Sequence, residues 1–466
     1  MVQSISGNFI HGIKHNACAA KLPVNAIEHT SFTSFLKTVK SSQVPNINAP
    51  NTILNEADKR KYIYLLNFLN GCRLSPNAEG LSACSQLDIL LKNGKLLAKS
   101  KNDKSTTLDN LYDIATKKRV DGLDAGRIIT DTLDILVNPR YVTQNFGDIP
   151  QMEYQNVLSA QKHDSDVVKN PNLMNVNTSG SGTCCAASNE VNMADKYPAE
   201  FARWISKLSS EDKELYLNVD LKTISKDPLD AAFILKVLGA DNKKFSYKDS
   251  KIKVTLDDNA YIRAKIQTNY WDRGERNIAD VLIQSAIMRL GSQNTYDSLT
   301  DNRQPIFNSN TQGLIEIEKT FVESLIKGKE ITSLVYQKID DEQNLVGYTC
   351  SFDKMSKHIT DTLKSGDDVI IGYVLTNETA GIVNNSDYNP KTHGAPNQVI
   401  NGHEITIVDY IQDKSGKISF VCIDTDDDSN DFVIYNADWL LPKIHHAGYP
   451  ASIVAADEKE IMSQVA

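Results

Sequence analysis

The hydrophobic period of the chain changes along its length, and this change limits the fold more than any other feature of the sequence. Between about residues 55 and 326, apolar residues recur mainly at the spacing of helices. After about residue 345 the spacing becomes that of strands, which are predicted over 368–375, 403–410 and 417–424. Helices that come first and antiparallel strands that come last predict an α+β fold.

The same patterns divide the chain into four parts. Residues 1–50 are polar and predict a flexible leader. Residues 51–145 hold three apolar stripes at helical spacing, ended by Pro139, and predict a helical N-terminal domain, which could also be a pro-region that covers a site. Residues 146–455 form the main predicted domain, and residues 456–466 form a tail.

Charge and hydropathy exclude several classes of protein. A net charge of −9 and a pI near 5.6 argue against a general nucleic-acid or membrane-surface binder. The sequence has no apolar run of the roughly 18–20 residues that a spanning helix needs. Its first residues lack a basic region and an apolar core, so no signal peptide is predicted, and the expected location is cytoplasmic or reached by non-classical export. The oligomeric state is left open.

The seven cysteines are an odd number and include no CxxC pair, which predicts free thiols in a reducing compartment rather than a disulfide scaffold. Five of them are expected to be small buried hydrophobes. Two are adjacent to each other, Cys184 and Cys185, and follow a glycine-containing loop.

This loop, Asn175–Gly182, leads into a predicted helix. Ser179, Gly180 and Gly182 allow the backbone to fold tightly and to approach a substrate closely. The run Ala-Ala-Ser-Asn-Glu-Val-Asn-Met-Ala that follows the cysteine pair contains good helix formers. Unpaired N–H groups and the positive end of the dipole at the start of a helix stabilise a thiolate. The sequence therefore predicts a nucleophilic cysteine at this position.

A thiolate needs a base, and the base needs a group that orients it. His403 is the best-placed base because it begins a predicted strand directly after a polar, glycine-containing loop. If the turn between this strand and the next comprises residues 413–416, His403 lies opposite Asp426, and Asp424 lies one diagonal step away on the same side. Either carboxylate would accept an Nδ1–H bond. We favour Asp424, which ends the apolar run, and keep Asp426 as the alternative.

A cysteine at the start of a helix, a strand-initiating histidine far downstream and an acid after the next strand resemble the papain-like cysteine peptidases in the broad sense. The block Gly-Thr-Cys-Cys-Ala-Ala-Ser at 182–188 is similar to their Gly-Ser-Cys-Trp-Ala-Phe-Ser. The alignment places the nucleophile at Cys184 and Cys185 at the usual aromatic position. The resemblance covers roughly residues 150–450 and implies a papain-like fold.

The resemblance also implies a peptidase with a protein or peptide substrate. In the family, a glutamine shortly before the cysteine donates to the oxyanion. No glutamine stands at that distance here, and Asn177, which carries the same amide donor, is predicted to share the oxyanion with the backbone N–H of Cys184. The Asn-Ser-Trp that usually follows the second strand is absent as well.

Several alternatives stay open. Cys185 is the second candidate for the nucleophile. The thioester that a nucleophilic cysteine forms would give a peptidase with water, an acyltransferase with an amine, or a deamidase with a side-chain amide. A papain-fold interaction protein with an inert cysteine is the alternative from another class.

Neither a metal nor a cofactor is predicted. The acidic run has Asp424, Asp426 and Asp428 at the spacing of a calcium loop, but Ser429 and Tyr435 replace the glycine and the glutamate that such a loop needs. His445 and His446 are adjacent and are expected to point to opposite faces of a strand, which argues against metal binding.

Overall fold

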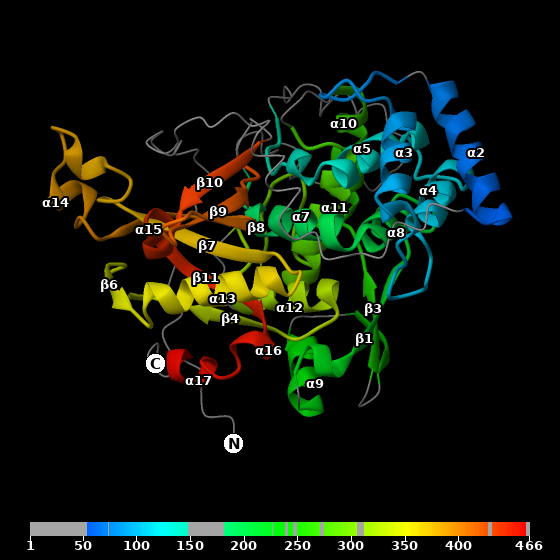
Figure 1. Cartoon of the computed structure of the whole chain (residues 1–466). Helices are drawn as coiled ribbons and strands as arrows, with labels where there is room; N and C mark the ends of the chain where they lie inside the picture. Colours follow the sequence, from blue (N-terminus) through cyan, green and yellow to red (C-terminus); the bar gives the residue numbers. More distant parts are fainter. Residues whose placement is uncertain are drawn as a thin grey trace.

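The computed structural model describes residues 54–72, 74–147, 181–225, 227–237, 241–245, 249–270, 275–304, 312–426 and 431–462. Helices and antiparallel sheets occupy largely separate regions of the molecule, with the N-terminal helices on one side and the large sheet on the other (Figure 1). The predicted α+β class is confirmed. The predicted leader, residues 1–50, lies outside the described residues.

The helical region forms largely where the apolar spacing predicts it. Capping fixes several of its helix starts: Thr106 and Asp109 form a reciprocal capping box, and Asn277 and Asp280 form another. Its helices are α2 (Glu56–Cys72), α3 (Ala83–Lys92), α4 (Thr107–Thr116), α5 (Ala125–Val137), α7 (Cys184–Lys196), α8 (Pro198–Leu208), α9 (Pro228–Val237), α10 (Asp258–Tyr270), α11 (Ile278–Gly291) and α12 (Glu316–Lys327).

One hydrophobic core runs through this region. Leu111 of α4 and Ile129 of α5 belong to the same buried cluster as Trp204 of α8 and Leu282 of α11. The N-terminal helices therefore pack directly on the helices that follow the nucleophile loop. The predicted domain boundaries stay predictions.

The large sheet is antiparallel throughout, with strand order β10-β9-β8-β7-β11-β4. Its strands are β4 (Ile331–Val335), β7 (Val369–Thr376), β8 (Val399–Gln412), β9 (Ile418–Ile423), β10 (Phe432–Asn436) and β11 (Ile444–Pro450). Every residue of the central strand β7 is buried, as its run of β-branched residues predicts.

Helices cover both faces of this sheet (Figure 1). Ile405 and Ile407 of β8 share a core with Met355 and Ile359 of α13 (Phe352–Lys364). Thr406, between them, donates a hydrogen bond to the backbone oxygen of Ser188 in α7, 3.2 Å away. Alternate residues of β8 thus face α13 and α7. This packing brings the predicted nucleophile helix against the strand of the predicted base.

Smaller elements complete the described chain. A three-stranded sheet has the order β1-β3-β2, and β5 pairs with β6. These elements are β1 (Leu215–Asp220), β2 (Asp241–Phe245), β3 (Asp249–Val254), β5 (Gln337–Ile339), β6 (Leu345–Tyr348), α14 (Pro390–His393), α15 (Ala437–Leu440), α16 (Ala451–Val454) and α17 (Glu458–Met462). The last of these helices lies within the predicted tail.

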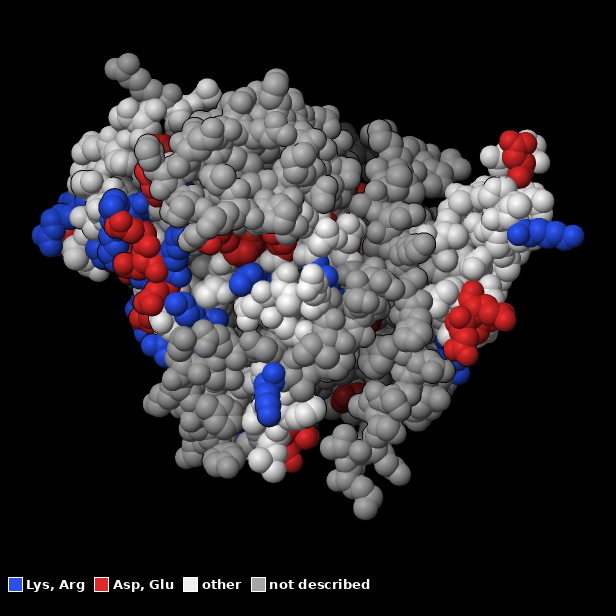
Figure 2. Space-filling model, turned by 180° about the vertical axis from the view of Figure 1, so that it is seen from behind, with Lys and Arg blue, Asp and Glu red and all other residues white. Residues whose placement is uncertain are grey.

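Along one side of the rear face, acidic and basic side chains are interspersed (Figure 2). Surface pairs such as Lys117–Asp113, at 2.6 Å, and Lys354–Glu460, at 3.2 Å, are typical of this mixed charge. Within the described part of the chain, no helix combines the length and the apolar character needed to cross a bilayer.

Candidate active site

The residues directly before Cys184 are held by buried hydrogen bonds. The Ser181 hydroxyl donates to the backbone oxygen of Gln144 at 2.7 Å, and the Gly182 N–H donates to Asp301 Oδ2 at 2.6 Å. Arg276 donates to Ser181 Oγ at 2.9 Å and also to the hydroxyl of Thr183. These contacts fix the direction in which the chain enters α7.

Glycine is required at position 182 for a steric reason. A Cβ atom there would lie 2.4 Å from the Cβ of Gln312 and 3.0 Å from the Gln312 backbone. Position 182 therefore lies directly against the segment that precedes α12. The close approach of the loop to a substrate stays a prediction.

Cys184 is the first residue of α7, as predicted, and its side chain is partly exposed. The first N–H groups of a helix have no partner within it, and they carry the positive end of the dipole. The Cys184 side chain lies close enough to the imidazole of His403, on β8, to contribute to the raised pKa of His403. A helix start and a neighbouring imidazole are the surroundings in which nucleophilic cysteines occur.

Asp424 is the carboxylate that contacts His403, with 2.7 Å between His403 Nε2 and Asp424 Oδ1. The prediction named Nδ1 as the bonding atom, and this detail was wrong. Because Nε2 faces the carboxylate, Nδ1 is the ring nitrogen left for the thiol of Cys184. The His403 ring also packs against Tyr373, its pairing partner on β7. The two ring centroids lie 5.7 Å apart in an edge-to-face arrangement.

The strand pairing explains how Asp424 reaches His403. Near the turn, Gln412 pairs with Ile418, one residue later than the predicted register requires. A bulge between Ile407 and Asp409 then shifts the pairing, so that Thr406 faces Ile423 as predicted. Asp424 follows directly after β9.

The charges of this pair stabilise each other. Burial acts to lower the pKa of His403, but the charge of Asp424 and the hydrogen bonds to Asp424 and Cys184 outweigh it, and the pKa lies well above its ordinary value. Burial acts to raise the pKa of Asp424, but the charge and hydrogen bond of His403 outweigh it and lower the pKa. An imidazolium beside a carboxylate is the favoured state.

Cys185, the alternative nucleophile, lies in different surroundings. Its side chain is buried, and burial together with the charge of Glu404 raises the pKa of its thiol well above the ordinary value. The backbone N–H of Leu314 is hydrogen-bonded to it. Of the two adjacent thiols, Cys184 is the one that contributes to the raised pKa of His403.

The structure describes only some of the remaining predicted residues. Asn177 lies outside the described residues, and so does Asp428. Asp426 was the alternative to Asp424 as the orienting acid. Its backbone N–H donates a hydrogen bond to Asp424 Oδ1 at 3.1 Å and so supports the Asp424 carboxylate.

Gln144 is a residue that the sequence did not single out. Its backbone oxygen accepts the hydrogen bond of Ser181, and its backbone N–H donates to the oxygen of Thr425 at 3.0 Å. One peptide segment therefore joins the nucleophile loop to the residue after Asp424. The Thr425 hydroxyl also donates to Gln144 Oε1 at 3.2 Å. The partners of Gln144 are distant in the sequence, so no local pattern marks these contacts.

The two adjacent histidines were predicted to point to opposite faces, and this was wrong. The Nδ1 atoms of His445 and His446 lie 3.0 Å apart. The pairing of β11 with β7 shifts between Ile444 and His446, and this irregularity breaks the alternation on which the prediction rested.

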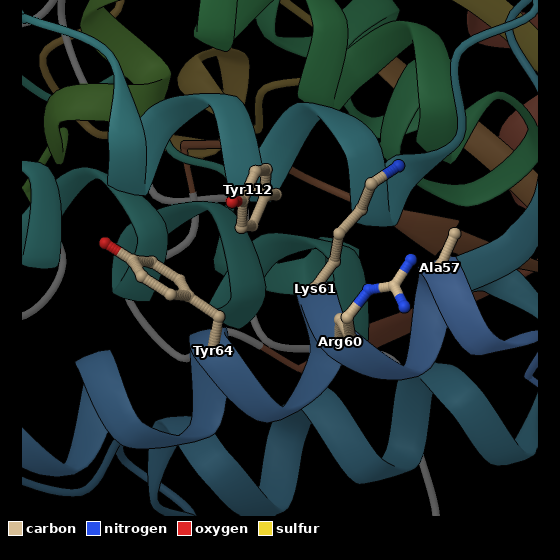
Figure 3. A pocket seen from close by; sticks show the side chains of 5 residues that line it. All are labelled: Ala57, Arg60, Lys61, Tyr64 and Tyr112. Atoms are coloured by element: carbon tan, nitrogen blue, oxygen red, sulfur yellow. The ribbon is translucent and has the colours of Figure 1, made fainter.

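A separate pocket lies between α2 and α4. Figure 3 shows its lining side chains, which are Ala57, Arg60, Lys61, Tyr64 and Tyr112. Lys61 is paired with Asp109, and the rings of Tyr64 and Tyr112 meet edge to face at 5.2 Å. None of the predicted site residues lines this pocket.

Comparisons with known proteins returned no relative: no family model matches the chain, and no curated protein is significantly similar to it.

Proposed function

We propose that the chain is a cysteine-nucleophile hydrolase with a papain-like fold, which cleaves peptide or amide bonds through a thioester. The observation that carries this proposal is the chain of contacts from Cys184, at the start of α7, to His403 and on to Asp424 at 2.7 Å. Nucleophile, base and orienting acid then stand in the order that nucleophilic catalysis needs.

In the first half of the reaction, the Cys184 thiolate attacks the substrate carbonyl and forms a C–S bond. His403, as imidazolium, gives its proton to the departing amine when the C–N bond breaks. In the second half, His403 takes a proton from water, the hydroxide attacks the thioester, and the C–S bond breaks to release the acid and the thiolate. Asp424 holds the imidazole and stabilises its charged form.

The tetrahedral intermediates carry a negative oxygen that needs donors. The backbone N–H of Cys184 is such a donor, because the first N–H groups of α7 have no partner within the helix. Asn177 remains the predicted second donor.

Labelling by iodoacetamide at pH 6 tests the proposal, with mass spectrometry to locate the adduct. The wild type is compared with Cys184→Ala, Cys185→Ala and His403→Ala. Fast labelling at Cys184 that is lost in His403→Ala supports the thiolate–imidazolium pair. Labelling no faster than that of a free thiol, or independent of His403, would favour the interaction protein with an inert cysteine.

The products of a peptide mixture then distinguish the reactions that share this chemistry. A peptidase creates new N-termini, a deamidase converts glutamine or asparagine to the acid, and an acyltransferase joins an added amine to the acyl group. Cys184→Ala is the matched blank, since it removes only the sulfur.

A further inference from the structure

A second polar cluster lies near the candidate active site and takes no part in the proposed chemistry. Glu316, His445 and His446 each offer a ligand atom, and these atoms all lie within 4.8 Å of one another. Glu316 is the first residue of α12, and the two histidines are on β11. The histidines are buried, and the side chain of Glu316 is 28% exposed, so the cluster has an open side.

The fold makes room for these rings. The irregular pairing of β11 brings both imidazoles to one place, with their Nδ1 atoms 3.0 Å apart. Opposite them, Gly372 of β7 has no side chain, and a Cβ atom there would lie 2.0 Å from the His446 ring. The niche for His446 therefore depends on a glycine in a strand that is otherwise rich in β-branched residues.

The distances within the cluster fit a tetrahedral metal ion. Ligand bonds of about 2.0 Å place neighbouring ligand atoms about 3.3 Å apart on a tetrahedron. The distance between His445 Nδ1 and His446 Nδ1 is 3.0 Å, and that between His446 Nδ1 and Glu316 Oε1 is 3.5 Å. Two imidazoles and one carboxylate are a ligand set that zinc prefers.

The surroundings also supply an outer carboxylate. Glu404 Oε1 lies 3.5 Å from His446 Nε2, and Glu404 Oε2 is buried without a hydrogen-bond partner. A ligating histidine commonly donates its other N–H to a carboxylate, which fixes the ring and makes it a better ligand. Glu404 stands where this role requires it.

Lys319 is the other neighbour of the cluster. Its ammonium lies 2.8 Å from His446 Nε2 and is paired with Glu404. An ammonium can only donate, so His446 Nε2 accepts from Lys319 in the structure. A metal on Nδ1 requires Nε2 to carry the proton and donate it to Glu404, so Lys319 must turn away from His446 and keep Glu404 as its partner.

We propose that Glu316, His445 and His446 bind one zinc ion, with the fourth position open to water, and that the ion ties the start of α12 to β11. The proposal is independent of the chemistry of Cys184. Because a reactive thiolate and His403 also attract zinc, the test is made in the full-length Cys184→Ala chain.

Zinc titration followed by calorimetry, with the bound metal counted by mass spectrometry, gives the test. One zinc per chain is expected in Cys184→Ala, and its loss is expected when His446→Ala is added. His393→Ala removes an exposed histidine on α14 and is the matched control, which should leave zinc binding unchanged. Absence of bound zinc in Cys184→Ala, or unchanged binding with His446→Ala, would overturn the proposal.

Glu316→Gln keeps the shape of the cluster and decides the matter if His446→Ala fails to fold, which circular dichroism detects. It should weaken zinc binding roughly tenfold or more; unchanged affinity refutes the proposal. Cobalt in place of zinc should give a spectrum without a thiolate charge-transfer band. A band that disappears with Cys185→Ser would make Cys185 a ligand and overturn the three-ligand site.

Discussion

Cys184 and Cys185 are neighbours in the sequence, yet they contact different groups. Cys184 is partly exposed and lies near His403, whereas Cys185 is buried near Glu404 and Lys319. Their partners on β8 are also consecutive residues. Side chains alternate along a strand, and adjacent helix positions differ in direction by about 100°. Where α7 crosses β8, the contact between Cys184 and His403 is therefore separate from that between Cys185 and Glu404.

This difference shows that a helix start does not by itself make a cysteine reactive. Both thiols lie in the first turn of α7 and experience the same dipole. Cys184 has a cationic imidazole as its neighbour, whereas burial and the Glu404 carboxylate raise the pKa of Cys185 and keep its thiol protonated. Under the proposed function, the partner on the strand is what distinguishes the nucleophile from its neighbour.

Replacing each cysteine in turn gives the largest expected contrast. Cys184→Ala should reduce turnover by at least about a thousandfold, because the nucleophile is lost. Cys185→Ala should leave turnover close to that of the wild type. Product formation from a peptide mixture measures both, and the comparison breaks down if Cys185→Ala is the variant that loses activity.

Replacing the two strand partners sharpens the contrast. A thiol with an ordinary pKa near 8.5 is only about 0.3% ionised at pH 6, so His403→Ala should slow the labelling of Cys184 about a hundredfold. Glu404→Gln should leave that rate unchanged. It should instead destabilise the fold by about 3–5 kcal/mol, since it leaves the buried Lys319 without its charged partner.

Alkylation rates and urea midpoints separate these outcomes. Slower labelling in Glu404→Gln with an unchanged midpoint would show that the two pairs are not independent.

Much of the first pair of contacts could be predicted from the sequence. Glycines followed by helix formers place a helix start at Cys184, and the period of two with a short turn brings Asp424 close to His403. These signals are local, or they depend on one hairpin. The α+β class follows from the same change of period.

The rest depends on contacts that no local pattern contains. The bulge that shifts the register of β8, and the irregularity that brings His445 and His446 together, arise where strands pair across the sheet. In the Ser181–Gln144–Thr425 connection, Gln144 contributes its backbone N–H and C=O, which every residue has, and its partners are distant in the sequence. The irregular pairing of β11 is the reason that the alternation rule misplaced the two histidines.

The two candidate acids provide the next contrast. Asp424→Asn should reduce turnover about tenfold to a hundredfold, because the imidazolium loses its charged partner. Asp426→Asn should have a smaller effect, since the residue supports Asp424 through its backbone N–H.

The effect of Asp424→Asn on stability should depend on pH. The raised pKa of His403 contributes stability that is complete below about 6.5 and is lost as the pH rises through the raised value. The lowered pKa of Asp424 contributes stability that is present above about 3.9 and is lost as the pH falls through the lowered value.

The wild type should therefore exceed Asp424→Asn in stability most clearly between about pH 4 and 6.5. Urea midpoints across this range check the expectation. A difference that grows above neutral pH would contradict the assignment of an imidazolium–carboxylate pair.

The smallest expected effect concerns the loop that precedes both cysteines. In Gly182→Ala the new methyl group meets Gln312 at 2.4 Å, and either α7 or the segment before α12 must move. We expect a loss of about 1–3 kcal/mol in the free energy of unfolding. Gly347→Ala is the matched control, because a Cβ atom there has no neighbour within 4 Å. The position of this loop determines where Cys184 lies, so the labelling of Cys184 should slow a few-fold in Gly182→Ala. Equal slowing in Gly347→Ala would mean that global stability, rather than the position of the loop, controls the rate.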